Sequence, residues 1–322
     1  ASHTLPTARI GGLAIMASLT LIVLYHQTQS GDGIAVPLLL SALPVFAIGL
    51  AEDLGLFASP RRRLLAAGAS ATLFVMLTSQ WLQATDIPGL DQVLLWAPIG
   101  IAFSVFLSVG VSHAFNLIDG LNGLSGSTAL AASLALAYIA HDADLALHRD
   151  ILLILAAAVA GFLVFNFPWG NIFLGDAGAY AIGHLLVWLS ISILWNAPNV
   201  TPLAVLLIFF WPIADTLLAI TRRLWRGVPI AQPDRMHFHQ LVMRGVEIIL
   251  LGRRKRRLAN PLATTLTLPF ILMPIAAGAL LHGDRSNAAA ACAAFSLLFL
   301  CTYKAGMWLA PKLRRHAVQR PR

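Results

Sequence analysis

Residues 151–167 read ILLILAAAVAGFLVFNF, a run that contains no charged side chain. A helix needs roughly 20 consecutive apolar residues to cross a bilayer, so this run predicts a transmembrane helix. Comparable runs recur along the chain, in which 58% of residues are hydrophobic and only 11% are charged. With a mean hydropathy of +0.77, this composition excludes an ordinary soluble protein. We predict an all-α, polytopic integral membrane protein.

Ten apolar segments are long enough to be read as transmembrane helices. We expect them to form a single transmembrane domain over residues 1–322. The longest connection, residues 222–261, is expected to leave the membrane on the cytoplasmic side. The ten predicted spans are residues 10–26, 34–51, 64–82, 92–115, 124–140, 151–167, 179–195, 202–221, 262–282 and 287–309.

The basic residues predict which side of the membrane each loop faces. If the ten segments alternate in direction, only Arg149 and Arg285 of the 22 Lys and Arg residues fall on one side. The excess on the other side marks it as cytoplasmic. The net charge of +8 then reflects topology, and the basic run at 253–257 suits anionic lipid better than nucleic acid. We interpret the acids of the opposite side as ordinary loop solvation: Asp32, Asp86, Asp91, Asp142, Asp144, Asp150 and Asp284.

Acidic residues at the ends of apolar segments are the strongest functional signal. Carboxylates at a membrane boundary are costly unless they are paired, solvated or bound to metal. Glu52 and Asp53 directly follow one predicted span on the cytoplasmic side. Arg61, in the same loop, can meet phosphate charge with its forked donors. A helix-end cap with ordinary cytoplasmic arginines is the alternative for this loop.

The loop at residues 113–127, HAFNLIDGLNGLSGS, carries a more specific pattern. Asn116 and Asp119 are three residues apart and share one face if the preceding helix continues through them. Gly120 and Gly123 would let a ligand approach the backbone closely. Amide and carboxylate oxygens suit Mg²⁺, which keeps open positions for substrate phosphate oxygens. A simple Asn/Gly turn is the alternative.

Asp176 lies between glycines, just before the next apolar segment. There it would hold a metal ion against the positive end of a helix, or simply cap that helix. A fourth acid, Asp215, follows Pro212 inside a predicted span. A kink at the proline would expose Asp215 to the cytoplasmic site; a buried pair with an arginine is the alternative.

The long cytoplasmic connection contains the segment PDRMHFHQL at residues 233–241. Arg235, His237 and His239 together donate several hydrogen bonds, which suits a diphosphate. A structural zinc site would need further ligands nearby, and the neighbouring sequence offers none.

Together these motifs resemble the polyprenyl-phosphate N-acetylhexosamine-1-phosphate transferases, a family of integral membrane enzymes. The resemblance covers roughly residues 6–241. It implies a multi-pass protein of the bacterial inner membrane with a cytoplasmic active site. It also implies a first helix before residue 6, and whether such a helix precedes the given sequence stays open. The similar segments are residues 6–12 (PTARIGG), 52–53 (ED), 116–124 (NLIDGLNGL), 173–178 (FLGDAG) and 237–239 (HFH).

The resemblance also implies a reaction. In this family a polyprenyl phosphate, usually undecaprenyl phosphate, attacks the β-phosphorus of a UDP-N-acetylhexosamine and releases UMP. This is the first membrane step of surface polysaccharide synthesis. The resemblance implies Mg²⁺ as the cofactor, with Mn²⁺ as the alternative ion, and a homodimer as the assembly.

The resemblance carries roles over to individual residues. It implies Asp176, Asn116 and Asp119 as the metal site. It implies Glu52, Asp53 and Asp119 as catalytic residues, with the first two facing the lipid phosphate. For substrate binding it implies Asn122 at uracil, Arg235, His237 and His239 at the diphosphate or sugar, and we add Arg61 at phosphate.

Four departures from the family pattern narrow the substrate. Glu52 stands where the family has aspartate, and Asn122 stands where many bacterial members have aspartate. Ala179 replaces a common serine, and Phe238 interrupts the consecutive histidines of peptidoglycan members. These departures favour the UDP-N-acetylhexosamine branch over the pentapeptide-sugar enzyme. UDP-GlcNAc is the default donor, with UDP-GalNAc and 6-deoxy sugars left open.

Two further alternatives stay open. We expect direct in-line attack, with Asp53 positioning the lipid phosphate or accepting its proton, whereas the rival mechanism forms a covalent aspartyl intermediate. A transporter of an anionic substrate would also use acids and interrupted helices. Its ionisable groups should lie near the bilayer midplane, however, and here they gather on one face.

Overall fold

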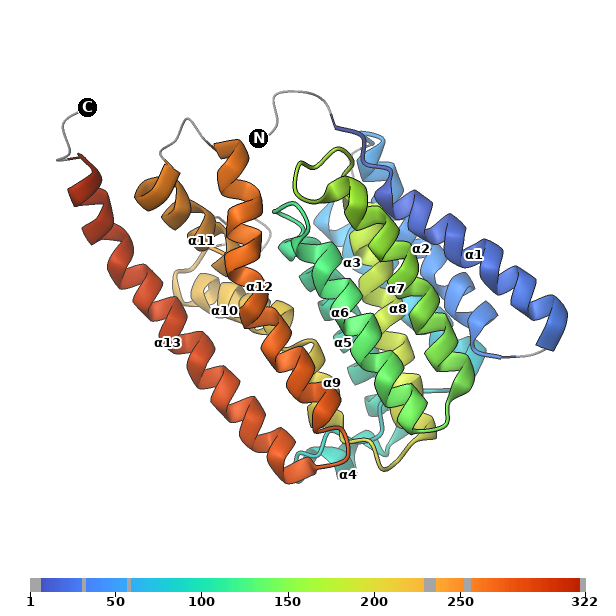
Figure 1. Ribbon diagram of the computed structural model, residues 1–322. Coiled ribbons are helices and arrows are strands. Elements are labelled where there is room, and N and C mark those ends of the chain that lie inside the picture. Colours follow the sequence, from blue (N-terminus) through green and yellow to red (C-terminus); the bar gives the residue numbers. More distant parts are fainter. Residues whose placement is uncertain (1–6, 31–32, 57–58, 229–235, 252–255, 319–322) are drawn as a thin grey trace.

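The structure is a computed structural model and describes residues 7–30, 33–56, 59–228, 236–251 and 256–318. Within these residues all regular elements are helical, and the long helices form one bundle (Figure 1). The prediction of an all-α protein is therefore confirmed. The elements are α1 (Gly11–Ser30), α2 (Ala35–Asp53), α3 (Pro60–Thr78), α4 (Leu90–Leu94), α5 (Ala97–Ile118), α6 (Leu124–Asp142), α7 (Ala146–Asn166), α8 (Gly175–Asn196), α9 (Pro202–Ile208), α10 (Phe210–Trp225), α11 (Phe238–Val246), a π-helical turn (Glu247–Leu251), α12 (Arg256–Leu280) and α13 (Arg285–Val318).

The number of membrane spans is lower than the sequence predicted. In the described part of the chain, seven helices are long and apolar enough to cross a membrane, or eight if α9 and α10 form one bent span. The prediction of ten spans is therefore wrong. Helices do occupy the other two predicted segments, but α3 carries three arginines in its first turn, and the described apolar stretch of α1, Gly11–Leu21, is shorter than a span. The seven helices are α2, α5, α6, α7, α8, α12 and α13.

The central helix of the bundle is α8. In its most apolar 18-residue stretch 94% of the residues are buried, and the helix carries no charge beyond Asp176. A helix that is apolar on all faces is stable only when other helices surround it. Gly12 of α1 and Gly49 of α2 contact its first turn so closely that a Cβ atom would lie 2.3 Å from the nitrogen of Gly178 and 2.5 Å from that of Ala177. These two contacts fix the position of the start of α8.

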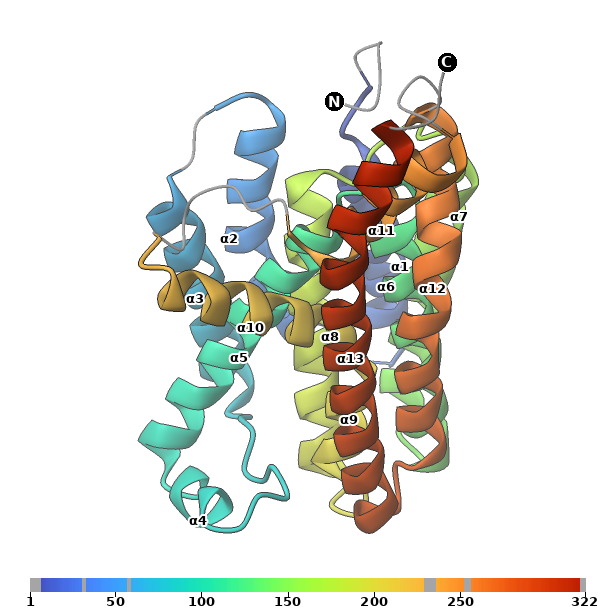
Figure 2. The ribbon, with the colours of Figure 1, turned by 90° about the vertical axis from the view of Figure 1, so that its left-hand side faces the viewer.

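The segment predicted as one span over residues 202–221 is broken into two helices. α9 and α10 meet at 78°, with Phe209 outside the helical geometry between them. Pro212 lies in the first turn of α10, where its missing N–H removes no helical hydrogen bond. Figure 2 shows α10 crossing the long axis of the bundle. The segment bends as expected, but at Phe209 rather than at Pro212, and Asp215 on α10 is only 3% exposed rather than open to water.

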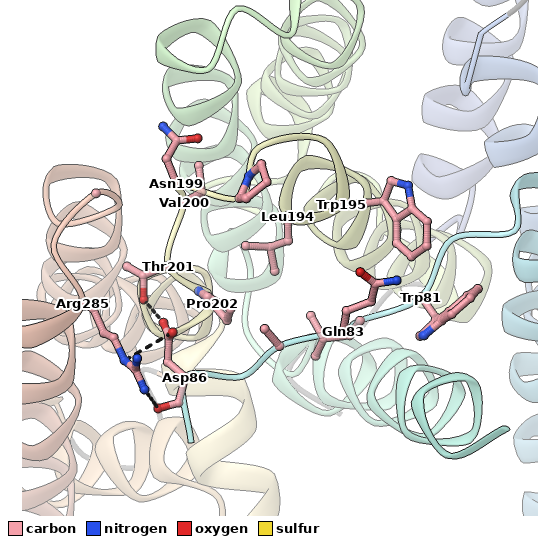
Figure 3. A pocket seen from close by; sticks show the side chains of 14 residues that line it. Trp81, Gln83, Asp86, Leu194, Trp195, Asn199, Val200, Thr201, Pro202 and Arg285 are labelled. Carbon is pink, nitrogen blue, oxygen red and sulfur yellow. Dashed lines mark hydrogen bonds and ion pairs between the residues drawn. The ribbon is translucent and has the colours of Figure 1, made fainter. Parts of the chain in front are cut away.

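At the lower end of the bundle in Figure 1, an ion pair joins three distant segments. Asp86 lies 3.3 Å from Nε of Arg285 and accepts a hydrogen bond from Thr201, while Nη2 of Arg285 donates to the carbonyl of Asp86 at 2.7 Å. Figure 3 shows these side chains beside a pocket of about 350 Å³. The interpretation of Asp86 as a solvated loop residue is therefore wrong.

Two more acids at this end have partners: Asp91 was interpreted wrongly as loop solvation, whereas Asp142 pairs with a histidine while its side chain stays 58% exposed. Asp91 accepts hydrogen bonds of 2.7 Å from both the backbone and the hydroxyl of Thr85. Asp142 lies 2.9 Å from Nε2 of His282, which ties the end of α6 to the end of α12. These acids hold the lower connections of the bundle together.

We expect Asp86→Asn to lower the thermal stability of the detergent-solubilised protein without loss of its activity. The substitution removes one charge of a partly buried, hydrogen-bonded pair, which costs ~1–3 kcal/mol. Asp86 has a φ of +62°, a conformation that asparagine tolerates, so backbone strain is not expected. Asp144→Asn is the matched control, because Asp144 is exposed and also has a positive φ. Equal melting temperatures of the two variants would contradict this prediction.

Candidate active site

Asp53, the last residue of α2, binds the first turn of α8. Its two carboxylate oxygens each accept a hydrogen bond of 3.0 Å, one from the backbone N–H of Asp176 and one from that of Ala177. Its side chain is 2% exposed, and Nη1 of Arg9 lies 3.5 Å from Oδ1. An anion at a helix N-terminus is stabilised by the helix dipole. Asp53 therefore joins α2 to α8, and Arg9 balances part of its charge.

The end of α5 brings two more predicted residues to the same place. Nδ2 of Asn116 donates a hydrogen bond of 2.7 Å to Oδ1 of Asp176. Asp119 follows directly after α5 and keeps some surface exposure, yet protein atoms surround its carboxyl group. This desolvation raises the pKa of Asp119 well above its usual value, and the negative charges of Asp176 and Asp53 raise it further. The cluster thus carries more negative charge than Arg9 offsets.

The donor set suits a hard cation. Within the described ranges, no three His, Cys, Asp or Glu side chains gather closely enough to hold a metal ion by themselves. Mg²⁺, however, is commonly bound by one or two carboxylates together with water and substrate phosphates. Asp176 and Asp119 supply carboxylates, and the amide of Asn116 supplies a neutral oxygen once it turns. The uncompensated charge of the cluster favours a cation at this position.

Glu52 lies beside this cluster but has a different environment from Asp53. Its Oε1 is 3.5 Å from Nη1 of Arg63, and its Oε2 is buried without a hydrogen-bond partner among the described residues. Arg61 is exposed in the first turn of α3, whose start is capped by Ser59. Arg63 is therefore the arginine of this loop that lies next to the acids, and the predicted phosphate contact of Arg61 stays a prediction.

Asn122 is held in a tight loop between α5 and α6. Its backbone N–H donates to Oδ1 of Asn260 at 2.8 Å, and its side-chain amide donates to the carbonyl of Pro168 at 3.0 Å. The next residue, Gly123, donates to Oδ1 of Asn166 at 2.6 Å and has a φ of +79°, which glycine adopts readily. The predicted uracil contact of Asn122 is untested, but its loop is fixed by three other segments.

The histidine segment packs against the same loop. His237 and His239 are 4% and 2% exposed, and Nε2 of His239 lies 2.8 Å from the point where a Cβ of Gly120 would stand. The structure thus brings His239 next to the loop that carries Asp119. Nδ1 of His237 lies 3.1 Å from Oδ2 of Asp215, so this acid pairs with a histidine rather than forming the predicted arginine pair. Arg235 lies outside the described residues.

The family model for glycosyl transferase family 4 matches residues 35–194. The chain is also 30% identical over 289 residues to the decaprenyl-phosphate N-acetylglucosaminephosphotransferase of Mycolicibacterium smegmatis, with 79% of this chain and 68% of that protein covered. This chain belongs to glycosyl transferase family 4. The resemblance seen in the loop motifs is thereby confirmed.

Two other relatives have names that describe the same kind of transferase. The probable undecaprenyl-phosphate N-acetylglucosaminyl 1-phosphate transferase of Bacillus subtilis is 27% identical over 240 residues. That match covers 73% of this chain but 65% of the relative, so the chain spans less than two thirds of its length. The undecaprenyl-phosphate alpha-N-acetylglucosaminyl 1-phosphate transferase of Escherichia coli is 28% identical over 156 residues, covering 47% of this chain and 42% of that protein.

Three residues of the candidate site had no role predicted from the sequence. Arg9 belongs to the quoted segment at residues 6–12, which gave no reason to place it beside Asp53. Asn166 and Asn260 fix the loop of Asn122 from α7 and α12. A sequence signal for Asn166 does exist, because it is the one polar residue in the apolar run at 151–167. Asn260 follows a basic run and offers no comparable signal.

We expect His239 to make the stability of the protein depend on pH. Burial lowers the pKa of His239 from 6.5 to about 4, with Asp215 raising it and His237 lowering it by smaller amounts. The unfolded chain therefore binds a proton below pH 6.5, whereas the folded protein does not until about pH 4. This contribution is complete above pH 6.5 and is lost as the pH falls through that window, by up to ~1.4 kcal/mol per pH unit.

Thermal denaturation between pH 7.5 and 5 would measure this effect. The wild type should lose more stability on acidification than His239→Gln, which removes the titrating group. Parallel losses in the two proteins would contradict the prediction.

Proposed function

We propose that this protein transfers N-acetylglucosamine-1-phosphate from UDP-GlcNAc to a polyprenyl phosphate and releases UMP. A phosphate oxygen of the lipid forms a bond to the β-phosphorus, and the bond from that phosphorus to the oxygen bridging to the α-phosphate breaks. The names of the relatives support the choice of both substrates. The observation that carries the proposal is the contact of Asn116, Asp176 and Asp53 at one end of the bundle.

Mg²⁺ is proposed as the cofactor, held by Asp176 and Asn116 with Asp119 beside them. When bound, the ion would offset the charge of the acids and stabilise negative charge on the phosphate oxygens. Without such an ion the cluster would repel two anionic substrates. The need for a cation therefore follows from the charges present in the chain.

The lipid nucleophile needs orientation more than a strong base. The second pKa of a phosphate monoester is about 6, so the group is mostly ionised at neutral pH. Both oxygens of Asp53 are already bound to α8, which leaves Glu52 and Arg63 better suited to contact the lipid phosphate. We therefore propose direct in-line attack, with Asp53 holding the site together and Glu52 and Arg63 positioning the acceptor.

The membrane side, the domain organisation and the assembly are proposed as follows. The site end of the bundle carries Arg9, Arg61, Arg62 and Arg63, which favours the cytoplasmic side of a bacterial inner membrane. The chain is proposed to act as one transmembrane domain, in which residues 222–261 deliver the histidine segment. A homodimer is the proposed assembly.

UMP release by the purified protein tests the proposal. The assay would contain UDP-GlcNAc, undecaprenyl phosphate in detergent and Mg²⁺, with EDTA and acceptor-free controls. We expect release only when all three components are present, and matching formation of the lipid-linked sugar. No release with any UDP-N-acetylhexosamine would overturn the function. UMP release or UDP-sugar/UMP exchange without lipid would instead overturn direct attack in favour of a covalent intermediate.

A further inference from the structure

The histidine segment, residues 236–239, is held in place by α10 and α13. Tyr303 of α13 donates a hydrogen bond of 3.2 Å from its hydroxyl to the carbonyl of Met236, and Nη1 of Arg222 donates to that hydroxyl at 2.6 Å. Phe238 packs against Trp211 with ring centroids 4.8 Å apart and also contacts Phe299. The last helix, which carries no diagnostic motif, therefore supports the segment that carries the histidines.

Asp215 makes the central contact of this arrangement. Its Oδ2 lies 3.1 Å from Nδ1 of His237, and its Oδ1 accepts a hydrogen bond of 3.0 Å from the backbone N–H of Phe238. Phe238 is the first residue of α11, so Asp215 also places negative charge at the start of that helix. Both oxygens of one buried carboxylate are thus engaged by two consecutive residues. The bend between α9 and α10 brings Asp215 to this position.

The contact determines which nitrogen of His237 carries hydrogen. A carboxylate only accepts hydrogen bonds, so Nδ1 of His237 must be the donor. Its other ring nitrogen, Nε2, is then the one that accepts a proton or, when protonated, donates a hydrogen bond. A carboxylate that fixes the tautomer and the orientation of an imidazole in this way is a common supporting element of catalytic and metal sites.

The same acid lies close to the second histidine. Nδ1 of His239 is 4.0 Å from Oδ2 of Asp215, and the rings of His237 and His239 stack with centroids 5.9 Å apart. Nε2 of His239 is buried next to Gly120 and has no hydrogen-bond partner among the described residues. One carboxylate thus stands behind both imidazoles, and His239 presents a free nitrogen to the loop of the acidic cluster.

We infer that Asp215 is a positioning residue for the transfer reaction: it holds His237 in its Nδ1–H tautomer, at the start of the segment that packs against the loop of Asp119. This inference rests on the proposed function. Asp215 touches no reacting atom in this account, because it acts through His237. Its removal should therefore affect turnover through the histidine, without loss of the fold.

Asp215→Asn is the sharpest test, because the amide has the same shape but offers only one acceptor oxygen. That oxygen cannot serve both His237 and Phe238. We expect kcat to fall ~10–100-fold, as for other groups that orient an imidazole, while the KM for UDP-GlcNAc stays close to the wild-type value. If Asp215 acts through His237, the double variant with His237→Gln should lose no more activity than His237→Gln alone.

Tyr303→Phe is the matched control. It removes a tether to the same segment but leaves both imidazoles and Asp215 intact, so we expect lower thermal stability with kcat near the wild-type value. An equal fall in kcat for Tyr303→Phe and Asp215→Asn would show general loosening of the segment and overturn the inference. Wild-type kcat in Asp215→Asn, or additive losses in the double variant, would overturn it as well.

A readout without turnover separates this inference from the proposed function. Diethyl pyrocarbonate labelling, quantified by mass spectrometry, should rise at His237 in Asp215→Asn compared with wild type and Tyr303→Phe. Unchanged labelling would overturn the anchoring of His237 even if the enzyme is active. A wild type that releases no UMP but shows the labelling difference would overturn the proposed function and leave the anchoring supported.

Discussion

Asp176→Asn is expected to reduce UMP release by ~10²–10³-fold, the range found when one electrostatic stabiliser of a transition state is removed. The asparagine keeps the shape of the side chain and an oxygen for the amide of Asn116, so the contact of 2.7 Å can persist. The charge that would balance a cation near the transferring phosphate is lost. Initial rates at saturating UDP-GlcNAc and undecaprenyl phosphate measure the effect.

The control for Asp176→Asn is an isosteric change at the other end of the bundle. Asp150 pairs with its neighbour Arg149 near the surface, far in sequence from the acidic cluster. Asp150→Asn should keep the wild-type rate, and both variants should keep the wild-type melting temperature within a few degrees. If Asp176→Asn is as active as Asp150→Asn, the site assignment is wrong.

Gly49→Ala is expected to cause the second large loss, through packing rather than charge. A Cβ at Gly49 would lie 2.5 Å from the Cα and the nitrogen of Ala177 and 2.7 Å from the carbonyl carbon of Asp176. These are backbone atoms, so α2 and α8 must separate to admit the methyl group. Overpacking of this kind costs ~1–3 kcal/mol. The same movement would pull Asp53 away from the start of α8, so activity should fall as well.

Gly68→Ala on α3 is the matched control, because a Cβ there meets no atom within 4 Å. Replacing glycine by alanine at an open helical position stabilises by ~0.4–1 kcal/mol. Melting temperatures from size-exclusion profiles after heating should therefore move in opposite directions for the two variants. A Gly49→Ala protein as stable and active as Gly68→Ala would show that α2 and α8 do not need this close contact.

The helical fold was predictable because apolar runs are explicit in the sequence, but the number of spans was not. Hydropathy treats residues 202–221 as one segment, whereas Phe209 breaks it into α9 and α10. Likewise α3 carries three arginines in its first turn. The length of its apolar part alone does not show that these charges lower its fitness as a membrane span. Whether such a helix crosses the membrane depends on where its charged turn lies, and a window average does not contain that information.

The acidic cluster was predictable as a group, since Asn116, Asp119 and Asp176 all lie where predicted spans end on one side. The partner of each residue was not. Asp215 was expected beside an arginine or in water, yet it binds His237 from a helix that changes direction. Arg63 rather than Arg61 lies beside the acids, because the rotation of α3 about its axis turns Arg63 toward Glu52. These pairings depend on how separate helices pack, which local sequence does not encode.

The two hydrogen bonds between Asp53 and α8 restrict the length of the side chain at position 53. A glutamate at position 53 would press its longer side chain against Gly175. The contact is already close there, because a Cβ added to Gly175 would lie 2.4 Å from Oδ2 of Asp53. A longer side chain at position 53 therefore requires the start of α8 to move.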